Sequence, residues 1–161
     1  MGPTKRRGAS MVHGYCFTQL SRLQVDQCFP LLIGLLPALT LERWRDVCAR
    51  AEMEGARLFG LVRGEYVRGL CSTQVWPVAA DRLSLGVPLF VVPSALDHAA
   101  VTGAMIRGLR RLCASEGLER LQIVAPSDPS TRQLLERSGP DAIRSTVVVE
   151  FTASFAEAGV Q

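Results

Sequence analysis

The sequence predicts a single α/β (α+β) domain with a mixed central sheet of about six or seven strands, flanked by about four helices. Strand-like and helix-like stretches alternate unevenly along the chain, which indicates a mixed sheet instead of a purely parallel one. An apolar run at 89–92 precedes an amphipathic stretch at 98–116 and a second apolar run at 119–125. That order predicts two parallel strands joined by a right-handed helical crossover.

Composition supports one globular domain. Hydrophobic residues make up 48% and charged residues 20% of the 161 residues, which is typical of a folded protein with a sizeable core. Residues 1–10 hold three basic residues and no acidic one, so we expect a disordered basic tail there. The domain should span 11–155, and residues 156–161 should form a flexible C-terminus.

The charge balance of the domain argues against a nucleic-acid partner. Of the 18 basic residues, three lie in the tail, which leaves 15 basic against 15 acidic residues in 11–161. The longest apolar run, 29–39, is too short to span a bilayer and contains Pro30 and Pro37. We therefore expect a cytoplasmic protein, monomer or homodimer, with no nucleic acid and no membrane as a partner.

The five cysteines are typical of buried, reduced thiols. Their number is odd and no two form a Cys-x-x-Cys pair, so neither a disulfide framework nor a zinc ribbon is indicated. With only His13 and His98 besides, we expect no metal site and no Cys–His catalytic pair. Cys48 and Cys113 should be buried on helix faces.

The N-terminal part predicts a strand followed by two helices. Residues 12–20 favour a first strand, and apolar residues at helical spacing predict a helix over 24–36. This helix should be irregular because Pro30 falls in its first turns. Thr40 should cap the second helix. Its apolar face should consist of Leu41, Trp44, Cys48 and Ala51.

A three-stranded meander should follow. Residues 58–63 and 66–75 predict a hairpin that turns at Gly64 and Glu65, and 83–93 predicts the third strand. Pro88 should lie at a bulge or at a strand start, because it has no N–H for the ladder.

The C-terminal part predicts the crossover and two further elements. The helix over 98–116 should end at Gly117 and lead into the buried strand 119–125. A short helix should run from Asp128 to Gly139, and 145–151 should form the last strand. The long helix should face inward with Val101, Met105, Leu109 and Leu112.

This order of elements resembles the GCN5-related N-acetyltransferase (GNAT) family over roughly residues 12–152. The stretch "LPALTLERWRDVCARAEMEGARLFGLVRGEYVRG" is similar to the N-terminal helices, second strand and hairpin turn of small bacterial members. "LRRLCASEGLERLQIVAPSD" resembles their long helix and next strand, and "STRQLLERSGP" resembles their last helix. The resemblance implies the GNAT fold and transfer of an acyl group, usually acetyl, from acetyl-CoA to an amine.

The family binds the pyrophosphate of acetyl-CoA at a turn with Arg or Gln, two variable residues, Gly, one residue, then Gly or Ala. A helix N-terminus there offers free amides to the anion. The matching residues here are Asp97, Ala100 and Thr102, and Gly103 lies one residue too late. Free amides are expected at 101–104. The resemblance implies a cofactor-binding set of Val91, Pro93, Ala100, Val101, Thr102, Gly103, Ala104 and Asp128.

Two interpretations of this altered turn remain open. In the first, Ala100 intrudes by only a methyl group, Thr102 donates its hydroxyl to a phosphate, and CoA still binds. In the second, Asp97 caps the helix with its carboxylate, occupies the amides that a phosphate would need, and the site is lost. Three arginines on the helix either help to neutralise a phosphate or form a solvated face: Arg107, Arg110 and Arg111.

The resemblance assigns no catalytic residue. The family often uses a tyrosine of the last helix as the acid that protonates the leaving thiolate, and the matching residue here is Leu135, which cannot donate a proton. Asp81 and Asp97 are candidate bases acting through water. Candidate acids, each more typical of a cap or surface residue, are Ser127, Ser130 and Ser138.

The leading functional hypothesis is an acyl-CoA-dependent N-acyltransferase. A small-molecule or protein amine would attack the thioester directly, while amides of the strand 89–93 polarise the carbonyl. The alternative is a catalytically silent GNAT-like module that binds a partner or ligand. Tyr15 and Tyr66 are expected away from the thioester, and Trp44 and Trp76 either line the acceptor pocket or pack in the core.

Overall fold

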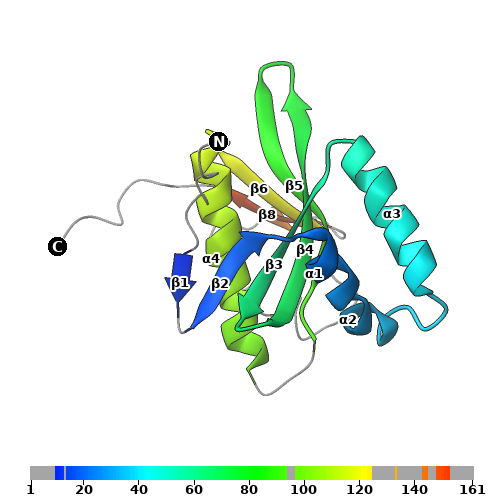
Figure 1. Ribbon diagram of the computed structural model, residues 1–161. Coiled ribbons are helices and arrows are strands. Elements are labelled where there is room, and N and C mark those ends of the chain that lie inside the picture. The colour runs from blue at the N-terminus through cyan, green and yellow to red at the C-terminus, as the bar shows by residue number, and fades with distance from the viewer. Residues whose placement is uncertain are drawn as a thin grey trace, which may run out of the picture.

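The structure, a computed structural model shown in Figure 1, describes residues 10–12, 14–93, 97–124, 133, 143–144 and 148–152. The predicted basic tail lies outside these residues except for Ser10, which already belongs to the first strand. The predicted flexible C-terminus also lies outside them. Of the helix predicted from Asp128, only Gln133 is described, and it is helical.

The described residues form an eight-stranded sheet in the order β1-β2-β3-β4-β5-β6-β8-β7. Only β5 and β6 pair in parallel, so the sheet is mixed as predicted. The strand predicted at 12–20 is two strands, because Gly14 turns the chain with a positive φ of 77°. The strands are β1 (Ser10–Val12), β2 (Tyr15–Gln19), β3 (Arg57–Arg63), β4 (Tyr66–Ala79), β5 (Arg82–Val91), β6 (Arg120–Val124), β7 (Ile143–Arg144) and β8 (Val148–Thr152).

Four helices accompany these strands in the described residues: α1 (Arg22–Gln27), α2 (Phe29–Ile33), α3 (Leu41–Met53) and α4 (His98–Ser115). None of the described helices is long and apolar enough to span a membrane. The irregular helix predicted at 24–36 is divided between α1 and α2, with Pro30 in the first turn of α2. Thr40 caps α3 as predicted, and its hydroxyl accepts a hydrogen bond from the Arg43 amide.

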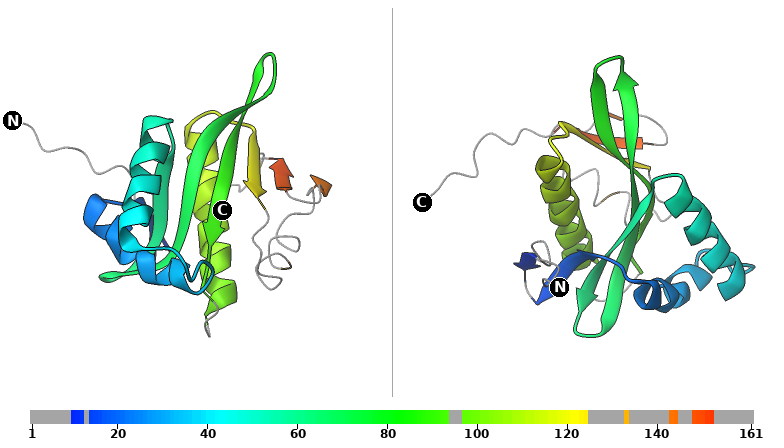
Figure 2. Two further views of the ribbon diagram at one scale, coloured as in Figure 1. Left: turned by 90° about the vertical axis from the view of Figure 1, so that its right-hand side faces the viewer. Right: turned by 45° about the horizontal axis from the view of Figure 1, so that its top comes forward.

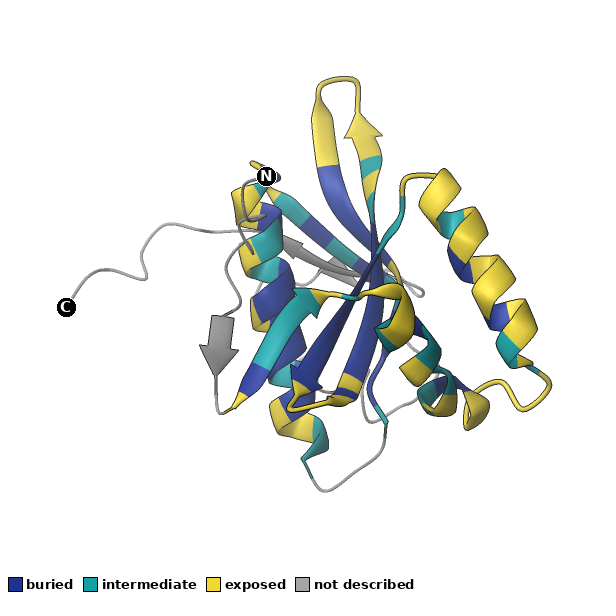
Figure 3. Ribbon diagram, in the orientation of Figure 1, coloured by how far each residue is buried: buried dark blue, intermediate teal, exposed yellow. Residues whose placement is uncertain are grey.

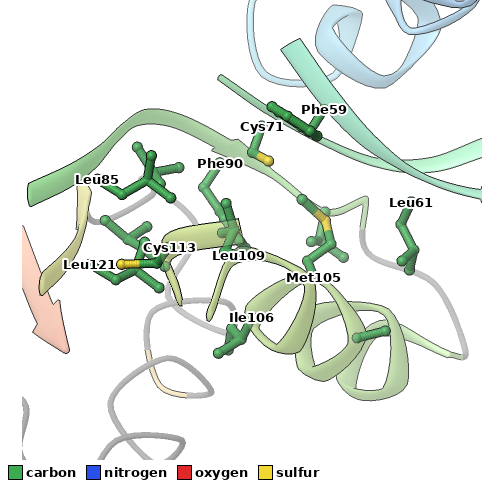
Figure 4. Close-up of a cluster of buried hydrophobic side chains, with 14 of the residues drawn as sticks. Phe59, Leu61, Cys71, Leu85, Phe90, Met105, Ile106, Leu109, Cys113 and Leu121 are labelled. Atoms are coloured by element: carbon green, nitrogen blue, oxygen red, sulfur yellow. The ribbon is translucent and has the colours of Figure 1, made fainter. Parts of the chain in front are cut away.

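The helices cover both faces of the sheet, α4 on one and α1 to α3 on the other (Figure 2). Under α4, apolar residues of the strands meet the buried face of the helix, with Leu85, Met105 and Leu109 fully buried (Figure 4). Under α1 to α3, Trp44 is buried and its indole N–H donates to the carbonyl of Val25 over 2.8 Å. Trp44 is therefore a core residue.

Helix α4 packs directly on the backbone of the sheet. A Cβ atom on Gly69 of β4 would lie 2.2 Å from the sulfur of Met105, and one on Gly108 of α4 would lie 2.3 Å from the ring of Phe17. Side chains at these two positions would push the helix off the strands. The two glycines therefore allow α4 to lie close to β2 and β4.

The predicted parallel crossover is confirmed, but its pairing lies further toward the start of β5 than expected. Residues 84–87 of β5 pair with 120–123 of β6, whereas 89–91 pair only with β4 among the described residues. Pro88 explains the shift, because it has no N–H to donate and lies at a bulge, where Val87 and Pro88 together face Thr73.

The hairpin of β4 and β5 projects beyond the sheet. Residues 74–83 lie beyond the last residue pair between β4 and β3, at Arg57, and beyond the first pair between β5 and β6, at Ser84. Much of this arm is exposed (Figure 3). Trp76 lies at its base, where the indole covers Gly86 and donates to the side chain of Gln74 over 3.4 Å. The second tryptophan is thus held mainly by the hairpin itself.

Candidate functional site

The residues that the sequence singled out gather where β5 ends and α4 begins. Residues 92–97 connect the two elements, and 92, 93 and 97 of them are described. The Nδ1 atom of His98 lies 3.1 Å from the carbonyl oxygen of Pro93. A carbonyl only accepts, so Nδ1 carries the proton of this hydrogen bond. His98 therefore holds the start of α4 against the end of β5.

Asp97 precedes α4 as its N-cap residue, but its side chain does not cap the helix. Its carboxylate instead accepts a hydrogen bond from the hydroxyl of Tyr15 in β2. This bond is the main cause that lowers the carboxyl pKa of Asp97, helped by the charges of Arg68 and Arg63 and opposed by desolvation. The interpretation of Asp97 as a helix cap is wrong, because a tertiary partner has drawn the carboxylate away.

The free amides lie earlier than predicted. The Val101 amide donates to the carbonyl of Asp97 over 2.9 Å, so it already belongs to the helical hydrogen-bond ladder. Helix α4 begins at His98, which places residues 101–104 inside it. An α-helix leaves the amides of its first turn without partners inside the helix, which here include those of Ala99 and Ala100. Both alanines are exposed, so these amides lie at the surface.

Of the seven described residues of the predicted cofactor-binding set, four are buried. Because the helix starts at His98, residues 101 and 104 fall on the face that packs on the sheet, and Val91 packs on the opposite face. Ala100 is exposed and Gly103 is half-buried. Asp128 lies outside the described residues. The buried members of the predicted set are Val91, Val101, Thr102 and Ala104.

Thr102 differs from its buried neighbours because its hydroxyl is polar. The residue is 1% exposed, and its Oγ1 atom has no hydrogen-bond partner in the described part of the chain. A buried hydroxyl without a partner is destabilising by about 1–3 kcal/mol. Such groups are rare in folded proteins, and each one calls for an explanation.

Two arginines that the sequence did not single out lie beside Asp97. Arg63, at the end of β3, places its guanidinium 5.4 Å from the ring centre of Tyr15. Arg68 in β4 is the extra residue of a bulge, since the register shifts by one between Leu61 and Val62. Both arginines are exposed. No local motif links them to Asp97, because the hairpin and the α4 turn are brought together only by the fold.

The second half of β5 can supply hydrogen-bond donors. Beyond Val87 it pairs only with β4 in the described structure, so its other edge carries backbone groups that β6 does not use. Along a strand, alternate residues direct their N–H and C=O groups to opposite edges. Amides within 89–91 therefore face this edge, at the strand that the sequence predicted would polarise a thioester carbonyl.

The four buried thiols are poor nucleophiles. Burial raises the pKa of Cys28 and Cys48 to about 12 and that of Cys113 to about 11, and it also raises the pKa of Cys71. All five cysteines are free, and only Cys16 is partly exposed. In the described residues no group of His, Cys, Asp and Glu could hold a metal ion. Covalent catalysis through a thiolate is therefore disfavoured at neutral pH.

The remaining candidate residues are dispersed. Asp81 lies exposed in the turn between β4 and β5, at the end of the projecting arm. Tyr66 is 74% exposed at the β3–β4 hairpin, whereas Tyr15 lies at the start of α4. Arg107 and Arg111 are exposed on α4, as a solvated helix face predicts. The residues considered as catalytic acids lie outside the described structure: Ser127, Ser130, Leu135 and Ser138.

No protein-family model and no curated protein matches the sequence. Solved structures do match. An acetyltransferase from Trypanosoma brucei shares 16% identity at a TM-score of 0.63, covering 83% of this chain and 96% of its own. A structure assigned to the GNAT acetyltransferases, from Bordetella pertussis, shares 18% identity at a TM-score of 0.62, covering 91% of this chain and 100% of its own.

A third similar structure carries a different description. It is a transcriptional regulator from Bacillus halodurans, with 12% identity and a TM-score of 0.66, covering 83% of this chain and 97% of its own. At such identities the likeness concerns the fold. The chain has the fold of the GNAT acetyltransferases, as its sequence pattern predicted.

Proposed function

We propose that the protein is an acyl-CoA-dependent N-acyltransferase that uses acetyl-CoA as its donor. The observation that carries the proposal is the junction of β5 and α4. The carboxylate of Asp97 is bound by Tyr15, and no side chain of the described residues caps the amides of Ala99 and Ala100 in the first turn of α4. Free amides at a helix N-terminus suit the pyrophosphate of CoA. The residues present therefore accommodate the donor despite the altered turn.

The unpaired edge of β5 supports the acyl-transfer step. An acyl thioester lying along 89–91 would receive a hydrogen bond from a backbone amide on its carbonyl oxygen. The neutral amine of the acceptor attacks the thioester carbon and a tetrahedral oxyanion forms. The oxyanion collapses, the carbon–sulfur bond breaks, the nitrogen gives up one proton, and the CoA thiolate takes up one proton. The acceptor is a small-molecule or protein amine, and no described residue is assigned as acid or base.

The sequence also bears on the location, the oligomeric state and the partners of such an enzyme. We propose a cytoplasmic monomer or homodimer that needs neither a metal nor nucleic acid, since residues 11–161 are balanced in charge and the thiols are free.

A second candidate is a silent module with the same fold. Leu135 at the position of the family's tyrosine favours it, and a transcriptional regulator is among the similar structures. Calorimetric titration with acetyl-CoA and with CoA decides between the two. Micromolar binding of acetyl-CoA, followed by release of CoA thiol in the presence of an amine panel, supports the enzyme. If the protein does not bind either compound at millimolar concentration, the silent module replaces it.

A further inference from the structure

We propose that Thr102 of α4 binds the acyl donor, by donating a hydrogen bond from its hydroxyl to an amide carbonyl in the pantetheine chain of CoA. The inference rests on the proposed function and adds a side chain to it. Thr102 is 1% exposed, yet its Oγ1 atom has no hydrogen-bond partner in the described residues. Buried polar groups without a partner are rare, so this hydroxyl calls for a functional explanation.

Helical spacing places Thr102 on the side of α4 that faces β5 and β6. Its row consists of residues three or four positions apart: His98, Thr102, Ile106, Leu109 and Cys113. Both ends of the row are anchored. His98 is hydrogen-bonded to the carbonyl of Pro93, just after β5, and the Cys113 thiol donates over 3.3 Å to the carbonyl of Arg120, the first residue of β6. The neighbouring row of α4 packs on β2 and β4 instead.

The two anchors also fix where Thr102 lies along β5. From the anchor at Pro93, Thr102 lies one helical turn, about 6 Å, back along the strand, which is about two strand residues. From the anchor at the start of β6, which pairs with Ser84, it lies about 16 Å further on, or about five strand residues. Both counts place Thr102 level with 89–91, where β5 no longer pairs with β6 among the described residues.

Side chains of this row reach the backbone of whatever lies beside β5. The Cys113 thiol does so where β6 still pairs with β5, because it contacts a carbonyl of the β6 backbone. An extended ligand along the free edge of 89–91 would take the place that β6 holds further down the strand. The Thr102 hydroxyl would reach such a ligand in the same way, and it is a stronger donor than a thiol.

The order of groups in acetyl-CoA selects an amide carbonyl as the partner. In the proposed function the thioester lies along 89–91, and the pyrophosphate meets the amides of Ala99 and Ala100 at the start of α4. The pantetheine chain joins these two ends and carries amide groups. Thr102 lies beside the edge of β5 and one turn inside α4, so the chain passes it on the way to the helix start.

The test uses the full chain and two probes. Acetyl-CoA contains the pantetheine chain, whereas adenosine 3′-phosphate 5′-diphosphate is the nucleotide half alone. Titration calorimetry compares the wild type with Thr102→Val, which loses the hydroxyl, and with Thr102→Ser, which keeps it. Thr73→Val is the matched control, because Thr73 is also fully buried but its hydroxyl donates to the carbonyl of Arg57. Thermal melting shows whether each variant is folded, and Thr102→Ala takes the place of a valine variant that does not fold.

Thr102→Val should weaken acetyl-CoA binding at least about tenfold and leave the affinity for the nucleotide half unchanged. Thr102→Ser should stay close to the wild type, and Thr73→Val should lose stability without losing affinity. Wild-type affinity of the folded valine variant for acetyl-CoA, or an equal loss with both probes, overturns the inference and leaves the acyltransferase proposal standing. If the wild type does not bind acetyl-CoA at millimolar concentration, that proposal fails and the inference fails with it.

Discussion

The hydroxyl of Tyr15 donates a hydrogen bond to the carboxylate of Asp97 and joins residues 82 positions apart. The bond connects β2, on one side of the sheet, with the turn that starts α4. Aspartate before a helix normally accepts hydrogen bonds from the first-turn amides. Here the side chain is engaged by tyrosine and makes no capping hydrogen bond to those amides.

Tyr15→Phe should make the protein less stable at neutral pH, and the difference from wild type should shrink in acid. The folded-state pKa of Asp97 lies below its ordinary value of 3.8, chiefly because of Tyr15. A lowered carboxyl pKa stabilises the fold above the unfolded-state value, and this contribution is lost as pH falls through the folded-state value. Urea unfolding between pH about 5 and about 2 measures it. A pH-independent difference would mean that the tyrosine acts through packing alone.

Charge at the α4 turn should control CoA affinity. Asp97→Asn and Asp97→Arg remove the negative charge and should strengthen binding, the second more than the first. Ala100→Glu adds a carboxylate beside the first-turn amides and should weaken binding by at least about 1.4 kcal/mol, or tenfold. Ala100 is exposed, so the variant should fold. Titration calorimetry measures the CoA affinity of the three variants, and thermal melting shows whether each is folded. CoA affinities equal to that of the wild type would mean that the phosphates bind away from the α4 turn.

Thr102→Val should raise stability by about 1 kcal/mol, because valine has nearly the same shape and removes a buried hydroxyl without a partner. Thr73→Val is the matched control. Thr73 is equally buried, but its hydroxyl donates to the carbonyl of Arg57 over 3.5 Å. Chemical denaturation measures both variants. Loss of stability in Thr102→Val would show that its hydroxyl is satisfied in solution.

Gly86→Ala should cost about 1–3 kcal/mol of stability, because the added Cβ would lie 2.1 Å from the indole of Trp76. The tryptophan should be displaced, which a change in fluorescence reports. Gly34→Ala is the control, since nothing lies within 4 Å of its Cβ position and its φ is negative. Pairing Gly86→Ala with Trp76→Ala should restore part of the loss, and additive effects would contradict the contact.

Thiol labelling should distinguish one cysteine from the other four. Cys16 is partly exposed and should react with a disulfide reagent in the native protein at pH 8. Cys28, Cys48, Cys71 and Cys113 should react only on unfolding, since they are buried and their pKa values are raised. All five should be free in denaturant without reductant. Rapid native labelling of a second thiol would indicate local opening of the element that buries it.

The regular elements of this fold could be predicted because their determinants are local. Thr40 precedes an amphipathic stretch and caps α3, and Gly64 with Glu65 turns the β3–β4 hairpin where strand patterns stop on either side. The crossover through α4 needs only an apolar run, a helix and another apolar run. Each of these signals lies within a few residues of the structure that it specifies.

The details of the site could not be predicted, because they depend on distant partners. Local preference favours Asp97 as a cap, and the fold overrides it by bringing Tyr15 to the carboxylate. Nothing near Arg68 in the sequence marks the bulge that shifts its register. The start of α4 at His98 was predicted correctly, but the expectation of free amides at 101–104 was wrong, because these residues lie beyond the first turn of that helix.

The bulge at Pro88 determines which way the end of β5 faces. Leu85 and Val87, before the bulge, lie in the cluster under α4. Phe90, after the bulge, belongs to the same cluster, although an odd number of positions separates it from Val87 and a regular strand would direct it to the other face. Deleting Pro88 would preserve every apolar side chain yet turn Phe90 toward α1 to α3. At this point the number of residues in the strand matters more than their identity. A replacement alters one contact, whereas a deletion turns the side chains that follow to the opposite face of the sheet.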